Sequence, residues 1–149
     1  MKRLSRSIAA LSLLVALAGP AAAQELHLEL TAPGVPGVYG FAAAGENFGY
    51  QVTGRVDLGA SIVLGASLPG PGGLGDFDPE TAWVMDLDRV SDRGSHVGRA
   101  HLPLALAGSV IQLRAAAFDG RATRVSQTFT LVVEPVDRGA DSRPRTGRP

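Results

Sequence analysis

Residues 125–133, Val-Ser-Gln-Thr-Phe-Thr-Leu-Val-Val, carry the clearest fold signal in the chain. Val125, Phe129, Leu131 and Val133 are apolar, and Ser, Gln and Thr fill most of the positions between them. Successive side chains of a strand point to opposite faces, so this alternation predicts a strand with one face in a hydrophobic core. We expect the four apolar side chains to point inward and the hydroxyl side chains to point outward.

Six further segments upstream have the same character, with short apolar or alternating runs separated by Gly, Pro and Asp. Such runs, bounded by turn-forming residues, are typical of strands, and no helical period extends beyond two turns. The predicted fold is therefore all-β, a single antiparallel β-sandwich of about seven strands, with a jelly roll or a small barrel as the alternative. The six segments are residues 25–30, 48–52, 60–68, 82–87, 95–104 and 110–118.

The hydrophobic core follows from the inward positions of these strands. Trp83, Met85 and Leu87 alternate in one strand, which places them on one face. Residues 69–75, Pro-Gly-Pro-Gly-Gly-Leu-Gly, form neither helix nor interior strand and are predicted to be a long surface loop. The predicted core residues are Leu28, Leu30, Phe48, Val52, Ile62, Leu64, Trp83, Ile111, Leu113, Phe129 and Leu131.

The N-terminus has the layout of a secretory signal peptide. Lys2, Arg3 and Arg6 precede an apolar run over residues 8–18, and Ala21-Ala22-Ala23 provides a small-residue cleavage signal. The run is shorter than the roughly 20 residues needed to cross a membrane as a helix. We predict residues 1–23 as the signal peptide, with cleavage near Ala23 and a secreted or periplasmic product.

The remaining 126 residues divide into a domain and a tail. Residues 24–135 are predicted to form the β-sandwich, and residues 136–149 lack large apolar side chains, which predicts a disordered tail rich in Arg and Pro. With 11 Arg, no Lys and 14 Asp or Glu, the mature chain has a net charge of −3 and no basic field for nucleic acid or anionic lipid. The absence of Cys excludes disulfides, thiolate metal sites and a lipoprotein anchor.

The turns and strands together resemble a known family. The chain contains Val52-Thr-Gly54 followed by residues 59–64, then Asp92-Arg-Gly94, and then Leu102-Pro103 before residues 107–117. This arrangement resembles secreted bacterial immunoglobulin-like or fibronectin-III-like β-sandwich domains over roughly residues 25–134. The resemblance implies a spacer, adhesion or binding module without catalytic residues. The chain departs from antibody domains in that it has no Cys pair.

Acidic side chains are the candidate metal ligands of the sequence. Asp76, Asp78 and Glu80 lie in one predicted loop, and Asp86 and Asp88 alternate at the end of the next strand. Alternate residues of an extended chain point the same way, and Ca²⁺ takes six to eight oxygen ligands. These five acids are therefore a candidate Ca²⁺ site, and the alternative is that they are solvated surface charges.

Phe77, between two of these acids in a Gly-rich segment, is the candidate exposed aromatic that anchors a partner or stacks on a sugar. The alternative is that it folds back over the core. His96 and His101 differ by an odd number of residues, so they face opposite sides of their strand and do not form a metal site. The glycines at 70, 72 and 75 match a dinucleotide-binding pattern, but Pro71 interrupts it and no helix follows.

For function, we expect a secreted non-enzymatic module with a structural, adhesion or protein-interaction role, with a secreted or surface protein or a glycan as partner. The first alternative is a Ca²⁺-dependent or carbohydrate-binding module that uses the acidic and aromatic loops. The second is a small secreted hydrolase. No cofactor other than Ca²⁺ is expected, and no nucleic acid partner or membrane span in the mature chain.

Overall fold

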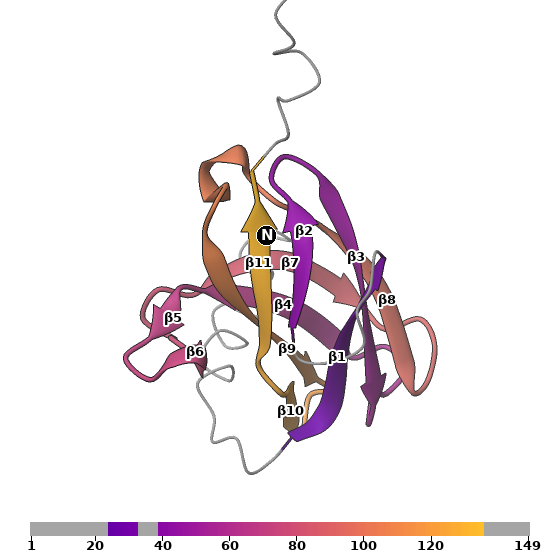
Figure 1. Cartoon of the computed structure of the whole chain (residues 1–149). Helices are drawn as coiled ribbons and strands as arrows, with labels where there is room; N and C mark the ends of the chain where they lie inside the picture. Colours follow the sequence, from indigo (N-terminus) through magenta and orange to yellow (C-terminus); the bar gives the residue numbers. More distant parts are fainter. Residues whose placement is uncertain (1–23, 33–38, 136–149) are drawn as a thin grey trace, which may run out of the picture.

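The computed structural model describes residues 24–32 and 39–135 of the chain (Figure 1). The predicted signal peptide and tail lie outside these residues. The described part is all-β, with one short 3₁₀ turn, η2 (Leu104–Leu106). The strands are β1 (Gln24–Ala32), β2 (Tyr39–Ala43), β3 (Asn47–Gly54), β4 (Ser61–Ser67), β5 (Pro69–Gly70), β6 (Gly73–Phe77), β7 (Trp83–Arg89), β8 (Ser95–His101), β9 (Val110–Phe118), β10 (Thr123–Ser126) and β11 (Phe129–Glu134).

Two groups of strands face each other and enclose the core. One group pairs in the order β2-β11-β9-β4-β7, and the other in the order β1-β3-β8. Strand β10 pairs with β9 and also with β1, so it joins the two groups into one nine-stranded sheet. Strands β5 and β6 form a separate two-stranded hairpin.

The predicted all-antiparallel, seven-strand arrangement was wrong in detail. Strand β1 pairs in parallel with β10, and β11 pairs in parallel with β2, so the sheet is mixed. The described chain has more strands than expected because β2 has no clear alternation in the sequence and because residues 69–77 form a hairpin where a loop was predicted. Gly73, with φ of 86°, occupies a backbone region that favours glycine and allows the hairpin to turn.

The predicted last strand is split into β10 and β11 by an extra residue. Val125 lies opposite Ala116 and Phe129 lies opposite Leu113, so three residues of one strand face two of the other. A bulge of this kind exchanges the two faces of a strand. Val125 consequently points to the side opposite Phe129 and packs with Ala116 in a second cluster, which corrects the expectation that both point inward.

The side chain of Gln127 completes the pairing at this bulge. Its Nε2 donates to the carbonyl oxygen of Leu28 at 2.7 Å, and its Oε1 accepts from the backbone N–H of Leu28 at 3.0 Å. A side-chain amide therefore takes the place of a backbone partner for β1, where the main chain of β10 ends. Both polar groups of Leu28 are satisfied in this way, as burial of backbone requires.

The main core lies between the two groups of strands. Ten of the eleven predicted core residues are buried, and Trp83 is partly buried and packs against the same cluster. Tyr50, Val56, Leu102 and Val133 join this core. Burial of this apolar surface is the main contribution that holds the two groups of strands together.

A bulge in β7 changes which side chains reach that core. Leu64 lies opposite Asp86 and Gly65 lies opposite Val84, so Met85 is the extra residue. Residues directly opposite each other share a face, which places Asp86 on the inner face with Leu64. The expectation that Leu87 shares the face of Trp83 and Met85 was therefore wrong, and Leu87 is 38% exposed.

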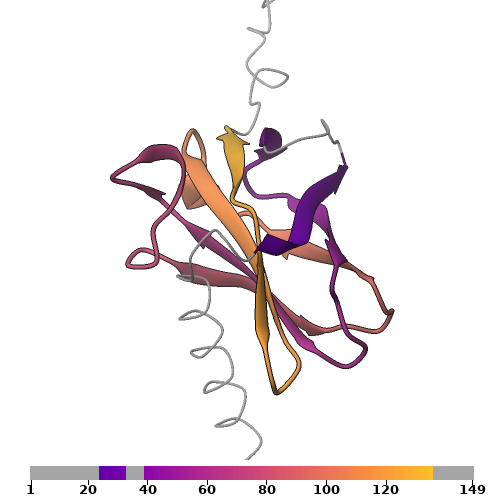
Figure 2. The ribbon, with the colours of Figure 1, turned by 90° about the horizontal axis from the view of Figure 1, so that it is seen from below.

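The β5–β6 hairpin covers the outer face of the β4–β9 pair, on the side of the molecule away from β1 and β3 (Figures 1 and 2). Beneath it, Phe77 packs with Val63, Ala116 and Val125 in a second apolar cluster. The buried side chain of Gln112 accepts a hydrogen bond from the backbone N–H of Gly75 at 3.1 Å and ties the hairpin to β9. Within residues 24–32 and 39–135, no helix has the length and apolar character needed to cross a membrane.

Candidate functional site

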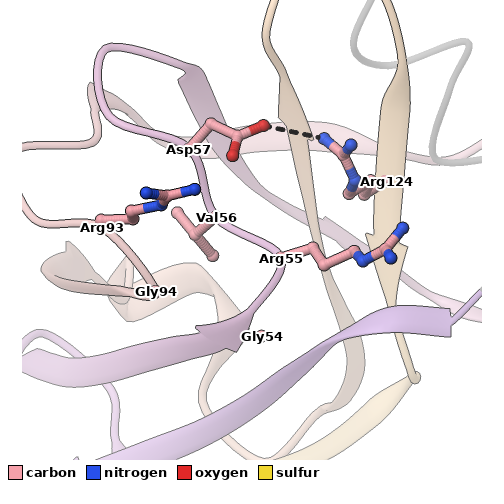
Figure 3. A pocket seen from close by; sticks show the side chains of 7 residues that line it. All are labelled: Gly54, Arg55, Val56, Asp57, Arg93, Gly94 and Arg124. Carbon is pink, nitrogen blue, oxygen red and sulfur yellow. Dashed lines mark hydrogen bonds and ion pairs between the residues drawn. The ribbon is translucent and has the colours of Figure 1, made fainter.

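A hollow of about 370 Å³ opens where β3 ends and is lined by charged side chains from three separate segments (Figure 3). Its walls come from the end of β3 with the loop after it, from the turn between β7 and β8, and from β10. The lining residues are Gly54, Arg55, Val56, Asp57, Arg93, Gly94 and Arg124.

Backbone hydrogen bonds hold the two loops of this hollow together. The N–H of Gly94 donates to the carbonyl of Val56 at 2.9 Å, and the N–H of Gly54 donates to the carbonyl of Gly94 at 3.3 Å. The side chain of Val56 is 1% exposed and anchors its loop in the main core. The charged side chains of the hollow therefore project from a fixed backbone.

Gly54 is the residue that permits this geometry. Its φ is 117°, in the region that favours glycine, and an added Cβ would lie 2.4 Å from the carbonyl oxygen of Glu25. That contact is with backbone of the neighbouring strand β1, which cannot move away as a flexible side chain can. A side chain at this position would consequently separate the end of β3 from β1.

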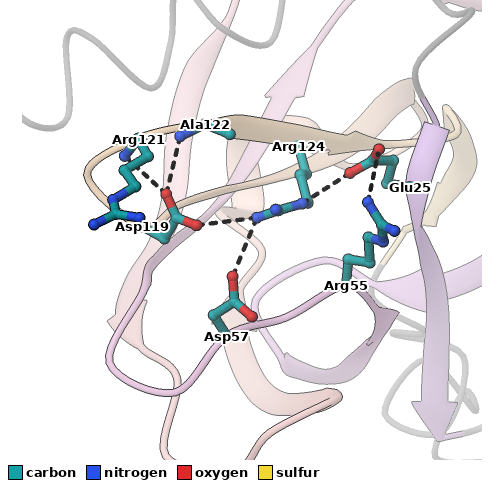
Figure 4. Close-up of polar contacts among 7 residues, drawn as sticks. All are labelled: Glu25, Arg55, Asp57, Asp119, Arg121, Ala122 and Arg124. Atoms are coloured by element: carbon teal, nitrogen blue, oxygen red, sulfur yellow. Dashed lines mark hydrogen bonds and ion pairs between the residues drawn. The ribbon is translucent and has the colours of Figure 1, made fainter.

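Arg124 is held by three carboxylates at one edge of the hollow (Figure 4). Its Nε donates to Glu25 at 2.8 Å, and its Nη1 donates to Asp57 and Asp119, each at 3.3 Å. Its side chain is 18% exposed, and those of the three acids are between 21% and 45% exposed. The guanidinium is thus fixed in place, because partly buried charges that share several hydrogen bonds lose much of their freedom.

Asp119 is fixed in turn by the tight turn between β9 and β10. Its Oδ1 accepts from the backbone N–H groups of Ala122 at 2.9 Å and Arg121 at 2.8 Å. These two hydrogen bonds, with a smaller contribution from Arg124, hold the pKa of the Asp119 carboxyl well below its usual range. Asp119 therefore stays ionised at a lower pH than a free carboxyl does and keeps Arg124 in a charged frame.

Two other arginines at the hollow are not held in this way. Arg55 is 73% exposed, and its nearest acid is Glu25, at 3.6 Å from Nη1. For Arg93, on the β7–β8 turn, the described part of the chain offers no hydrogen bond or ion pair, and the residue is exposed. Three guanidinium groups thus border one hollow. The three acids nearby, Glu25, Asp57 and Asp119, already form ion pairs with Arg124.

The five acids predicted as Ca²⁺ ligands lie in three places. Asp76 accepts from the backbone N–H of Gly72 at 2.8 Å, inside the β5–β6 hairpin. Asp78 accepts from the backbone N–H of Glu80 at 3.0 Å, in the turn before β7. Asp86 and Asp88 point to the inner face of β7.

Asp86 and Asp88 face aromatic residues of the opposite strands. The hydroxyl of the fully buried Tyr50 donates to Asp86 at 2.7 Å, and Nε2 of His96 lies 3.9 Å from Asp88. Burial first, and then the hydrogen bond and charge of Asp86, raise the pKa of the Tyr50 hydroxyl far above its ordinary value. His96 is 5% exposed, and its Nε2 has no hydrogen-bond partner within the described residues.

Among residues 24–32 and 39–135, no set of three or more His, Cys, Asp or Glu side chains is arranged to hold a metal ion. The predicted acids are separated because the β7 bulge turns Asp86 inward while the hairpin retains Asp76. In each place an acid instead accepts from a donor of this chain: Asp76 and Asp78 from a backbone N–H, and Asp86 of β7 from the Tyr50 hydroxyl of β3.

Phe77 is not the exposed aromatic that the sequence suggested. It is 7% exposed, and Arg114 lies over its ring with the guanidinium carbon 5.4 Å from the ring centroid. The second reading of the sequence, in which this ring folds back over apolar residues, describes what the structure shows. The reason is the second apolar cluster under the hairpin, which offers the ring a surface to cover.

The arginine-lined hollow was not predicted from the sequence. Its charged residues come from positions 55–57, 93 and 124, and no local spacing connects them. A signal was present, because Arg55 and Arg93 each adjoin a glycine of a turn, next to Gly54 and Gly94 respectively. Only the pairing of the two loops places these turns side by side.

No protein-family model matches the chain, and no curated protein matches its sequence. Among solved structures, the chain is similar to a cellulose-active polysaccharide monooxygenase from M. thermophila, at 12% identity and a TM-score of 0.45. The match covers 65% of this chain and 54% of that protein, so it spans about half of the other chain.

That neighbour is an enzyme, which contradicts the sequence-based expectation of a non-enzymatic structural, adhesion or protein-interaction module. We correct the expectation and do not retain it. A likeness at this TM-score assigns neither an activity nor a substrate to the present chain.

Proposed function

We propose that the chain binds a small anionic ligand in the hollow bordered by Arg55, Arg93 and Arg124. The observation that carries this proposal is the exposed guanidinium of Arg93 on a fixed turn, which has no hydrogen bond or ion pair among the described residues. Guanidinium groups present paired N–H donors that fit carboxylate, sulfate or phosphate oxygens. The anion would supply the partner that Arg93 lacks.

The neighbouring groups support this assignment. Arg124 keeps its place through its three acids and provides a rigid wall, so it need not be ordered when a ligand enters. Arg55 has only a long contact with Glu25 and is free to turn toward an anion. The volume of about 370 Å³ lies in the range of small-molecule sites and suits a ligand the size of a small organic acid.

The test is a titration of the ¹⁵N-labelled full chain with sodium propionate, followed by amide chemical shifts at constant ionic strength. We expect saturable shifts at the amides of Gly54, Asp57 and Gly94, and expect Arg93→Gln to weaken binding about tenfold or more, because a charge-assisted hydrogen bond is lost.

Arg99→Gln is the matched control. Arg99 is also an exposed arginine, on β8, but it does not border the hollow. This variant should bind propionate as the unchanged chain does. Shifts that spread over the whole surface, or an equal loss in both variants, would show that propionate is attracted by general charge and would refute the proposed site.

We further propose that the fold is immunoglobulin-like or fibronectin-III-like and that the protein acts after export. The grouping of β1-β3-β8 against β11-β9-β4-β7 supports the first point, since sandwiches of this type divide their strands in a similar way. The basic start and small-residue end of residues 1–23 support the second. Mass spectrometry of the exported chain would test it, and an N-terminus at Gln24 is expected.

A further inference from the structure

One acidic side chain faces the same hollow as the arginines. Asp57 lines it, and its side chain is 45% exposed. Its Oδ2 accepts from Arg124 at 3.3 Å, whereas no donor to Oδ1 is found among the described residues. Figure 3 shows this second oxygen directed away from Arg124 and toward the hollow, on the side of Arg93.

A free carboxylate oxygen restricts what can occupy the space beside it. An ionised carboxylate only accepts hydrogen bonds, so it repels a second anionic oxygen and favours a hydroxyl or an ammonium group. The arginines favour the opposite kind of group. A ligand that satisfies both parts of the hollow therefore carries an anionic group and a hydrogen-bond donor close together.

Resting on the anion-binding function above, we propose that the natural ligand is a carboxylic acid with a hydrogen-bond donor next to its carboxylate, an α-hydroxy or α-amino acid, and that Asp57 binds this donor. In this arrangement the ligand carboxylate lies against Arg93 and Arg55, and its hydroxyl or ammonium group donates to Oδ1 of Asp57. Arg124 holds Asp57 in the orientation that this requires.

Simple divalent anions fit the site less well. Sulfate has acceptor oxygens on every side and would place one of them against Asp57. Asp57 is thus a specificity-determining residue, whereas Arg93 supplies affinity for any anion.

Three acids of nearly equal size separate these roles: propionate, lactate and alanine carry a hydrogen, a hydroxyl or an ammonium group at the same carbon. We expect lactate or alanine to bind the full chain about tenfold more tightly than propionate in the same amide-shift titration, since a hydrogen bond to a charged group is added. Tighter binding of lactate than of alanine identifies a hydroxy acid as the ligand class, and tighter binding of alanine identifies an amino acid.

Asp57→Asn tests the role of the carboxylate. If the amide oxygen keeps the bond from Arg124, its Nδ2 faces the hollow as a donor. The ratio of the affinity for lactate or alanine to the affinity for propionate should then fall to about one, while propionate itself still binds. Asp57→Ala and thermal melting of each variant separate a loss of recognition from a loss of structure.

The outcomes distinguish the two proposals. Equal affinity for propionate, lactate and alanine in the unchanged chain overturns the present inference and leaves the anion site intact. A preference that persists in both Asp57 variants also overturns it. Absence of binding by all three acids and by sulfate refutes the anion site itself, and the inference with it.

Discussion

At the end of β3, the carboxylates of Glu25, Asp57 and Asp119 surround Arg124, whereas on β7 the carboxylates of Asp86 and Asp88 face Tyr50 and His96. The first group projects from loops and strand ends and borders an open hollow. The second lies between the edges of the two strand groups, with Tyr50 fully buried.

The difference shows what the partner of an acid contributes. Arginine with several carboxylates makes a charged frame that stays at the surface and leaves neighbouring cations available to a ligand. Tyrosine brings a large ring into the core and uses one hydroxyl to hold the edge strand β7. We therefore expect the edge cluster to contribute mainly to stability and the arginine cluster mainly to binding.

The largest expected effect is at Tyr50. Replacement by Ala removes a fully buried ring and should cost about 3–5 kcal/mol of unfolding free energy, measured by urea denaturation. Tyr50→Phe keeps the ring and removes only the bond to Asp86, so its cost should be about 1 kcal/mol. A small loss in Tyr50→Ala would show that the edge cluster does not join the two groups of strands.

A smaller loss of stability is expected at Arg124. Arg124→Gln leaves Glu25, Asp57 and Asp119 close together without the cation that they share, so the melting temperature should fall, and more at low salt than at high salt. The same variant should weaken propionate binding because the hollow loses one of its three guanidinium groups. Arg99→Gln is again the control, and an equal fall in that variant would contradict the special role of the cluster.

The smallest effect is the acid limb that Asp119 produces. The pKa of Asp119 is lower in the folded chain than in the unfolded chain, where it is about 4. Its ionised carboxylate therefore adds fully to the free energy of unfolding above that pH, and this contribution is lost as the pH falls further. Between about pH 4 and pH 2, the melting temperature of Asp119→Asn should accordingly fall less than that of the unchanged chain. Thermal melts at each pH measure this. Parallel curves would show that Asp119 has no such role.

Alternation in the sequence was sufficient to predict the all-β class and most of the core. Leu28, Val52, Ile62, Leu113 and Phe129 are buried as predicted, because a strand with period-two apolar residues gains most by covering one face. The prediction was wrong where one residue is inserted: at Met85 and after Ser126 a bulge exchanges the faces, and the composition around them gives no sign of it.

The candidate sites follow the same division. The acidic residues of the predicted site were grouped by their proximity along the chain, so Asp76 and Asp86 were assigned to one site. The same criterion gave no reason to place Asp57 beside Arg93 and Arg124, which are distant in the sequence. The all-β class and most of the core positions depend on local side-chain chemistry, so the sequence alone determined them. The partner of each charge depends on which loops pair across the sheet, and hydrogen bonds such as Gly94 to Val56 exist only in the folded chain, so only the tertiary structure decided where the arginines meet.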